Sequence, residues 1–559
     1  MSKFSLLFCF GVFLSLFVSL AEAVDLGTLT PPTPEYQLPK LPKWNAISPV
    51  DNLQLDNSEQ ALARVNNDIR FILKALQFRG NKTIGTEQLQ AIVQPFINKV
   101  VDRLDLEHIR QQLVNHYRNA GFLYPSIILP SQHISKGLVR YQIDEGQLTA
   151  INISGTERLN EDYVRQRIKL DTDQPLQKDA LLERFQMLLS DPLIERVNGA
   201  LKPGVNPGDT ILDLEITRAK AYEILLGMDN YTPPSVGAYN GQLTGIVRNL
   251  TGWGDFLQVN VNGGEGHQSI SSFFSIPVNR YDTRFNIAFQ GSQAKVIEGD
   301  LEELDIESHF MDFNVAINQP IFRSLNQVFS LELQYAFRQT KTSILGFPIA
   351  LAEGVDENGK AKVSVLRFIQ SYTDRNENRV YTARSSLNTG FDVFNATINA
   401  HPEADGRYFS WQGQLRYLHK LDERGSELFF RSDIQLTSET LLPMERFALG
   451  GINTVRGYRE YELVRDAGYA LSLELRYPLW QMSTQQKLQI IPFFDFGQAW
   501  NLHQKQKTLY SAGIGLKWRW QQIGAEFYWA QTLNNPDTID QEYDLQDSGI
   551  HFQLQAQLF

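Results

Sequence analysis

The stretch that decides the fold is Phe329-Ser330-Leu331-Glu332-Leu333-Gln334-Tyr335-Ala336-Phe337-Arg338, in which apolar and polar side chains alternate. The runs Leu257–Asn262 and Met311–Asn318 alternate in the same way. Successive side chains of a strand point to opposite faces, so each run has one apolar and one polar face. Strands of a soluble sandwich also alternate, but they are usually only ~5–6 residues long. The longer runs therefore predict a transmembrane β-barrel, with lipid outside and a wet lumen inside.

Such runs number about sixteen from Ala221 onward, so residues 220–559 are predicted to form an antiparallel barrel of about 16 strands. The connections after even-numbered runs are short, which is typical of periplasmic turns. Four connections after odd-numbered runs are long, as external loops are: Ala294–Ser308, Leu345–Lys362, Asn395–Asp405 and Thr437–Asp466. The last run alternates from Ile550 to Leu558, and Phe559 follows one residue out of phase. A terminal aromatic residue is what outer-membrane barrels present to the barrel assembly machinery, which is therefore a predicted partner.

The N-terminus has the features of a secretory signal peptide. Lys3 precedes an apolar run from Phe4 to Leu20, and Ala21-Glu22-Ala23 resembles a cleavage site, so residues 1–23 are predicted to be removed. Cys9 is the only cysteine, so the mature chain would contain no thiol and no disulfide. Residues 24–69 begin with a proline-rich segment and are predicted to be a linker. The net charge of −11 disfavours a nucleic-acid partner.

Between the linker and the barrel, one pattern of elements occurs twice. Residues 70–147 predict the order β-α-α-β-β, with Leu106, Ile109, Leu113 and Tyr117 on one face of the second helix. Residues 148–219 predict the same order again. A repeat of this kind indicates two tandem modules, each large enough to have its own core.

The second halves of both modules resemble a known family. Gly121-Phe122 is followed by Pro130, Gln132, Gly137, Leu138 and Glu145-Gly146, and Pro207-Gly208 is followed by Leu212, Leu214 and Ile216. These stretches are similar to the ends of the POTRA modules of the two-partner secretion transporters of FhaC, ShlB and HecB type (TpsB), within the superfamily of POTRA-containing outer-membrane barrels. The resemblance implies two periplasmic POTRA domains in front of a barrel in the cell outer membrane, in contact with its lipid.

The barrel contains two further stretches that resemble the family. Leu449–Tyr458 includes Val455-Arg456-Gly457-Tyr458, similar to the superfamily's loop motif, and Phe493–Gly497 is similar to its aspartate motif. The resemblance implies that the loop folds into the lumen. If Phe494 and Phe496 face lipid, Asp495 faces the lumen, and the same alternation turns Glu474 inward.

These residues predict an ion-pair cluster in the lumen, here called the lock, which would fasten the loop to the barrel wall. A guanidinium can bind a carboxylate through two hydrogen bonds, so Arg456 is expected to pair with Asp495, with Glu474 as a second acceptor. Gly457 would give the loop tip its backbone freedom, and Tyr458 would anchor it by packing.

The family resemblance implies export of a large secreted β-helical exoprotein, of haemolysin, adhesin, contact-dependent toxin or haem-binding type, recognised by the POTRA domains. The alternative is an outer-membrane assembly factor, or insertase, of the same superfamily. A plain porin would not explain the repeated module. The nine histidines show no metal-ligand spacing, and His108 and His116 share a helix face that is expected to be solvated. No catalytic residue, metal or cofactor is therefore predicted. Members of the family often place an N-terminal helix inside the barrel as a plug, and the proline-rich start before Asp51 leaves open whether this chain does so.

Overall fold

The computed structural model describes residues 53–55, 70–169, 175–483, 486–502, 504–534 and 543–558. The chain divides into two compact units at Lys220 and Ala221. The predicted signal peptide with Cys9, nearly all of the predicted linker, and Phe559 lie outside the described residues.

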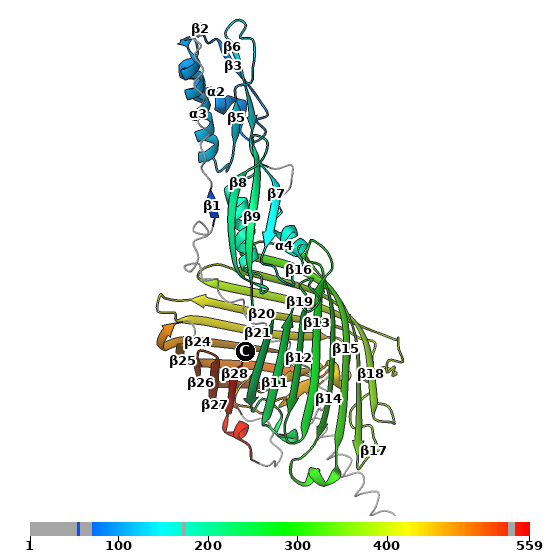
Figure 1. Cartoon of the computed structure of the whole chain (residues 1–559). Coiled ribbons are helices and arrows are strands. Elements are labelled where there is room, and N and C mark those ends of the chain that lie inside the picture. The colour runs from blue at the N-terminus through cyan, green and yellow to red at the C-terminus, as the bar shows by residue number, and fades with distance from the viewer. Residues whose placement is uncertain are drawn as a thin grey trace, which may run out of the picture. The chain divides into compact units, whose positions relative to one another are not determined.

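The first module packs two helices on a three-stranded sheet (Figure 1). Its main elements are β3 (Ala75–Arg79), α2 (Thr86–Val93), α3 (Arg103–Asn119), β5 (Ser126–Ile128) and β6 (Leu138–Asp144), with a small ribbon of β2 (Phe71–Ile72) and β4 (Val100–Val101). The sheet order is β3-β6-β5, and β3 runs parallel to β6. A capping box between Asp102 and Asp105 starts α3, and its apolar face, which includes Ile109 and Leu113, fills the core.

Glu145, within the resemblance described above, fastens the first module internally. Its buried carboxylate accepts hydrogen bonds from the backbone N–H groups of Lys82 and Thr83 at 2.9 and 2.8 Å, and from the Tyr117 hydroxyl at 3.3 Å. Gly146 follows with φ of 88°, and a Cβ there would lie 2.8 Å from the Tyr124 carbonyl oxygen. The Glu-Gly pair is therefore explained by a buried acceptor followed by a tight turn.

The second module repeats the β-α-α-β-β order, as the sequence predicted. Its elements are β7 (Gln147–Ser154), α4 (Glu161–Ile168), α5 (Lys178–Leu189), β8 (Ile194–Pro203) and β9 (Asp209–Arg218). The sheet order is β1-β8-β9-β7, in which β1 (Leu53–Leu55) runs parallel to β8 and β7 runs parallel to β9. A separate apolar cluster fills this module.

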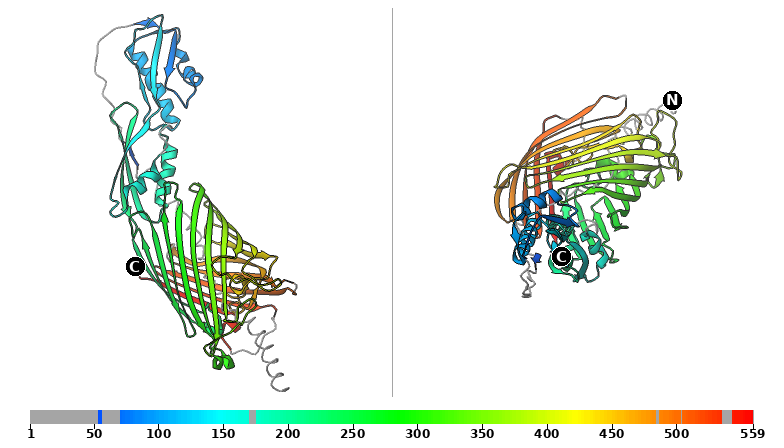
Figure 2. Two further views of the ribbon diagram at one scale, coloured as in Figure 1. Left: turned by 90° about the vertical axis from the view of Figure 1, so that its right-hand side faces the viewer. Right: turned by 90° about the horizontal axis from the view of Figure 1, so that it is seen from above.

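The predicted antiparallel barrel is confirmed, with sixteen strands closed by pairing of the first with the last. The strands are β10 (Tyr222–Asp229), β11 (Asn240–Arg248), β12 (Phe256–Gly263), β13 (His267–Pro277), β14 (Arg284–Lys295), β15 (Glu307–Arg323), β16 (Gln327–Ile344), β18 (Lys360–Arg375), β19 (Arg379–Phe391), β20 (Phe409–Lys420), β21 (Glu427–Thr437), β24 (Ala467–Ser483), β25 (Gln486–Trp500), β26 (Lys507–Trp520), β27 (Ile523–Thr532) and β28 (Ile550–Gln557). A two-residue piece, β17 (Phe347–Pro348), extends the pairing of β16. Figure 2 shows the wall of strands from two further directions.

The alternation read from the sequence corresponds to the two faces of this wall. On β16, Leu333 is 51 % exposed on the outer face, whereas Arg338 is 6 % exposed on the inner face. On β15, Phe313 and Ile317 are likewise exposed and Asp312 is buried. Within the described part of the chain, no helix is long and apolar enough to span a membrane.

Strand lengths and connections both differ around the barrel. β15, β16 and β18 contain 17, 18 and 16 residues, whereas β10 and β12 contain 8 each. Connections at the rim where β10 begins are short, such as residues 324–326 and 376–378. At the other rim they reach their greatest length in residues 438–466. Because β10 directly follows the modules in the chain, the short turns belong to the periplasmic rim.

We expect the mature protein to fractionate with the outer membrane and to migrate differently on gels before and after heating. A closed barrel keeps its strand pairing in detergent until heat breaks it. Recovery of the mature chain as a soluble periplasmic monomer would contradict this expectation.

Candidate functional site in the barrel lumen

The external connection at residues 438–466 folds back against the inner wall of the barrel. It contains η4 (Pro443–Glu445) and a short hairpin of β22 (Phe447–Leu449) and β23 (Leu463–Arg465). Val455 and Tyr458 in this loop are buried and belong to one apolar cluster with Ala470, Ala499 and Leu509 on the barrel wall. Burial of apolar side chains therefore draws the loop against the inside of the barrel.

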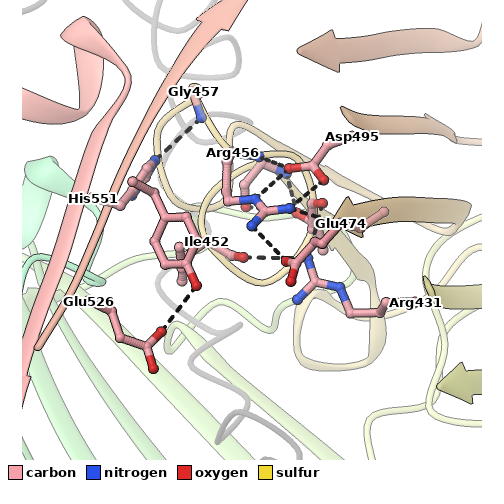
Figure 3. Close-up of polar contacts among 12 residues, drawn as sticks. Arg431, Ile452, Arg456, Gly457, Glu474, Asp495, Glu526 and His551 are labelled. Atoms are coloured by element: carbon pink, nitrogen blue, oxygen red, sulfur yellow. Dashed lines mark hydrogen bonds and ion pairs between the residues drawn. The ribbon is translucent and has the colours of Figure 1, made fainter. Parts of the chain in front are cut away.

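Arg456, near the loop tip, is bound by two carboxylates from the wall (Figure 3). Its Nε and Nη2 donate to the two oxygens of Asp495 on β25, both at 2.7 Å, and its Nη1 donates to Glu474 on β24 at 2.8 Å. Its backbone N–H also donates to Asp495 at 3.1 Å, and Nη2 donates to the Ser472 hydroxyl at 2.9 Å. The structure thus brings together the three charged residues that the sequence singled out.

Burial makes this cluster sensitive to the loss of any member. Arg456 is 2 % exposed and Asp495 is fully buried. Burial acts to lower the pKa of Arg456, but Asp495 and Glu474 outweigh it and hold that pKa above its usual range, so the guanidinium stays charged. Removing one partner from such a pair costs about 3–5 kcal/mol, because the other charge is left uncompensated.

An aromatic side chain completes the site. The Arg456 guanidinium lies 3.5 Å from the centre of the Phe493 ring, a distance at which the cation is attracted to the ring face. Phe493 is two residues before Asp495 on β25, so both side chains point inward. The sequence placed Phe493 in the aspartate motif but gave it no role, because it precedes another phenylalanine in an apolar run.

Gly457 and Tyr458 continue the loop tip beyond the ion pair. Gly457 has φ of 94°, and a Cβ there would approach the Ala530 side chain at 3.0 Å. Its N–H points to Nε2 of His551 on β28 at 3.4 Å. The Tyr458 hydroxyl lies 2.7 Å from the carbonyl oxygen of Asn534. The four residues Val455 to Tyr458 thus contact several separate strands and connections.

Comparison with known proteins identifies this architecture. Residues 208–519 match the family model described as haemolysin secretion/activation protein ShlB/FhaC/HecB, which covers more than half of the chain. The chain belongs to the ShlB/FhaC/HecB family. Residues 71–146 also match the model of the ShlB-type POTRA domain. The protein is an outer-membrane transporter of two-partner secretion, with its POTRA modules in the periplasm, as predicted.

Relatives of this transporter support the assignment. The heme/hemopexin transporter protein HuxB of Haemophilus influenzae is 25 % identical over 454 residues, which cover 78 % of this chain and 77 % of HuxB. The outer membrane transporter CdiB of Dickeya dadantii is 21 % identical over 503 residues, covering 84 % and 85 % of the two chains. These matches span both the periplasmic unit and the barrel.

Solved structures share the fold of the transporter. CdiB from Escherichia coli has a TM-score of 0.64 at 16 % identity and covers 90 % of this chain and 93 % of its own. BamA from Haemophilus ducreyi lacking POTRA domains 1–3 has a TM-score of 0.54 at 12 % identity and covers 87 % and 100 %. The family match favours the transporter over the insertase alternative.

The transporter fastens its loop tip at two further points that the sequence did not predict. The Gln546 side chain is fully buried; it accepts from the Glu460 backbone N–H at 2.9 Å and donates to the carbonyls of Asn230 and Thr232, both at 2.8 Å. Arg459 forms ion pairs with Glu298 at 2.7 Å and Asp547 at 2.6 Å. All these partners lie in external connections, where no periodicity marks a residue as buried or paired.

Glu460 differs from the two carboxylates of the lock in its protonation state. Burial raises the pKa of its carboxyl to about 8. Asp229 acts in the same direction, whereas a hydrogen bond from the Ile452 N–H at 2.7 Å acts in the opposite direction. The carboxyl is therefore mostly neutral at pH 7. The loop tip is consequently held by charge at Arg456 and by neutral hydrogen bonds at residue 460.

Proposed function

We propose that the transporter recognises a large secreted β-helical exoprotein with its POTRA modules and passes it through the lumen, past a loop that Arg456 holds. The observation that carries this proposal is the buried lock of Arg456 with Asp495 and Glu474. A loop fastened inside a pore occupies space that a passing chain needs. The lock is therefore proposed to hold the resting transporter in a defined state.

The modules offer two kinds of surface to an unfolded chain. β5 lies at the edge of its sheet, and its last residue Ile128 and the following Leu129 are exposed, so an extended segment could add to it as a further strand. A shallow, open groove of about 290 Å³ lies between α2 and α3, lined by Ile92, Gln112, Asn115, His116 and Asn119. His116 thus lines a groove rather than a catalytic site in this proposal.

The cargo and the assembly route are two further parts of the proposal. HuxB is named a heme/hemopexin transporter, which supports a haem-binding exoprotein among the four predicted cargo types. The proposed driving force is folding of the exoprotein outside the cell, since stacking of β-helical repeats stabilises the exported chain. The C-terminal strand β28, with the Phe559 that follows it in the sequence, is proposed to be the signal that the assembly machinery binds.

Deleting the transporter tests the function directly. We expect the exoprotein to disappear from the culture supernatant, while the abundance of other outer-membrane proteins stays unchanged. Immunoblotting of supernatant, periplasm and outer membrane, with re-expression of the transporter as the control, makes the measurement. A general loss of outer-membrane barrels would instead support the insertase.

A further inference from the structure

The first limb of the loop, residues 441–446, is buried against a different part of the barrel wall from Arg456. Leu441, Leu442 and Met444 are fully buried. They belong to one apolar cluster with inward-facing residues of three neighbouring strands, among them Phe310 on β15, Ala336 on β16 and Val365 on β18. The lock, in contrast, lies on β24 and β25. Three strands, β19 to β21, separate the two positions along the wall.

Glu445 ends this limb in a buried cluster of charges. Its carboxylate lies 3.2 Å from Nη1 of Arg338 on β16 and 3.0 Å from Nη2 of Arg367 on β18. Arg338 also forms an ion pair with Asp312 on β15 at 3.0 Å, and it donates to the Met444 carbonyl at 3.0 Å. Two cations and two anions thus balance in a region where Glu445 is only 5 % exposed.

The charge on Glu445 is maintained by its partners. Burial acts to raise the pKa of its carboxyl, but Arg338 and Arg367 outweigh burial and hold that pKa below its usual range. Its backbone carbonyl accepts from Gln435 on β21 at 2.8 Å, and the same amide donates to the Asp466 carbonyl at the other end of the loop at 3.0 Å. Gln435 therefore fixes Glu445 and the far end of the loop to the same strand of the wall.

We propose that Glu445 is a second anchor of the loop, and that the pore opens fully only when the contacts of Glu445 and of Arg456 are both released. Two anchors on separate strands restrict a loop more than one, because release of either leaves the other limb in the lumen. The inference builds on the proposed role of Arg456, but it makes a separate statement about residues 441–446.

Conductance of the full-length transporter in planar lipid bilayers tests the inference without an exoprotein. We compare Glu445→Gln, Arg456→Ala and the double variant with the wild type. Glu423→Gln, an exposed glutamate in the turn between β20 and β21, is the matched control. We expect each single variant to raise conductance modestly and the double variant to raise it several-fold, by more than the sum of the two single effects. Glu445→Asp, which keeps the charge, should remain close to the wild type.

The outcomes separate the two anchors. If the double variant conducts no more than Arg456→Ala alone, the second anchor is wrong and the lock is untouched. If Arg456→Ala alone leaves conductance unchanged and Glu445→Gln raises it fully, the role of Arg456 is wrong instead, and so is the need for two releases.

A reversible cross-link asks whether this limb must move during export. Glu445→Cys and Arg367→Cys are introduced together and bridged by a reducible bifunctional thiol reagent, with each single cysteine variant as the control. We expect the bridge to stop export of the exoprotein and a reducing agent to restore it. Undiminished export with the bridge in place would overturn the inference, whatever the conductance measurements show.

Discussion

Arg456→Ala is expected to reduce export of the exoprotein by about a hundredfold or more, while the barrel still assembles in the outer membrane. Truncation leaves the buried carboxylate of Asp495 without its cation, whereas Glu474 keeps Arg476 at 2.9 Å. Loss of one partner of a buried pair costs about 3–5 kcal/mol, which corresponds to a hundredfold or greater change in the population of the anchored loop. A loop that cannot be anchored again does not return to the resting state from which each round of export starts, so we expect export to fall even though ions pass more readily. Exoprotein in the supernatant and heat-modifiable migration of the barrel are the two measurements.

Charge reversal refines this test. We expect Arg456→Asp and Asp495→Arg each to impair export, and the double reversal to restore it in part, since an aspartate at 456 would still face Glu474. Arg424→Ala, in the exposed turn between β20 and β21, is the control and should export normally. Normal export by both single reversals, with no effect of combining them, would show that the lock has no role.

Deletion of either POTRA module is expected to abolish export and to leave an ion-conducting barrel. A wide lumen lined by polar residues offers no shaped pocket, so it discriminates poorly between chains. The modules, which directly precede β10 in the chain, provide the edge of β5 and the groove between α2 and α3. Export is measured in the supernatant, and bilayer conductance is measured for each deletion of 70–147 and 148–219. Normal export after deletion would place recognition inside the barrel.

Recognition by the modules can also be tested as binding in solution. Residues 70–219 contain both modules with their own apolar cores, so the purified fragment should bind the N-terminal segment of the exoprotein. Calorimetric titration measures the affinity, and Asn115→Trp, which would fill part of the α2–α3 groove, should weaken binding if the groove is used. A segment of scrambled sequence is the matched control.

Much of the fold could be predicted because its signals are local. The alternation of apolar and polar residues identified strands β15 and β16, and it also predicted that Asp312 and Arg338 face inward. The partner of Arg338 could not be found in this way, since Glu445 lies 107 residues further along the chain and in a loop. Pairing across such a distance is fixed by barrel closure, which no single stretch encodes.

The site was predicted only in part, for a related reason. Arg456, Asp495 and Glu474 were found from motifs and strand alternation. The contact of Phe493 with Arg456 was not predicted although Phe493 lies in a motif, and Gln546 lies in neither a motif nor an alternating run. Apolar and neutral polar residues are common on barrel walls and in loops. Their involvement depends on which loop segment packs against them, and that packing is a tertiary property.

The unequal strand lengths have a consequence outside the membrane. An 18-residue strand such as β16 is about 60 Å long and, tilted by ~40°, about 45 Å tall, whereas the apolar band of a barrel is only ~25 Å tall. The outer faces of β15, β16 and β18 accordingly become hydrophilic above the band, where His309, Lys341 and Lys360 lie side by side in register. An 8-residue strand such as β12 is only about 27 Å long before tilting, so it has no such excess over the apolar band. A chain that leaves the pore beside β15, β16 and β18 would therefore pass a wall of protein before it reaches open water.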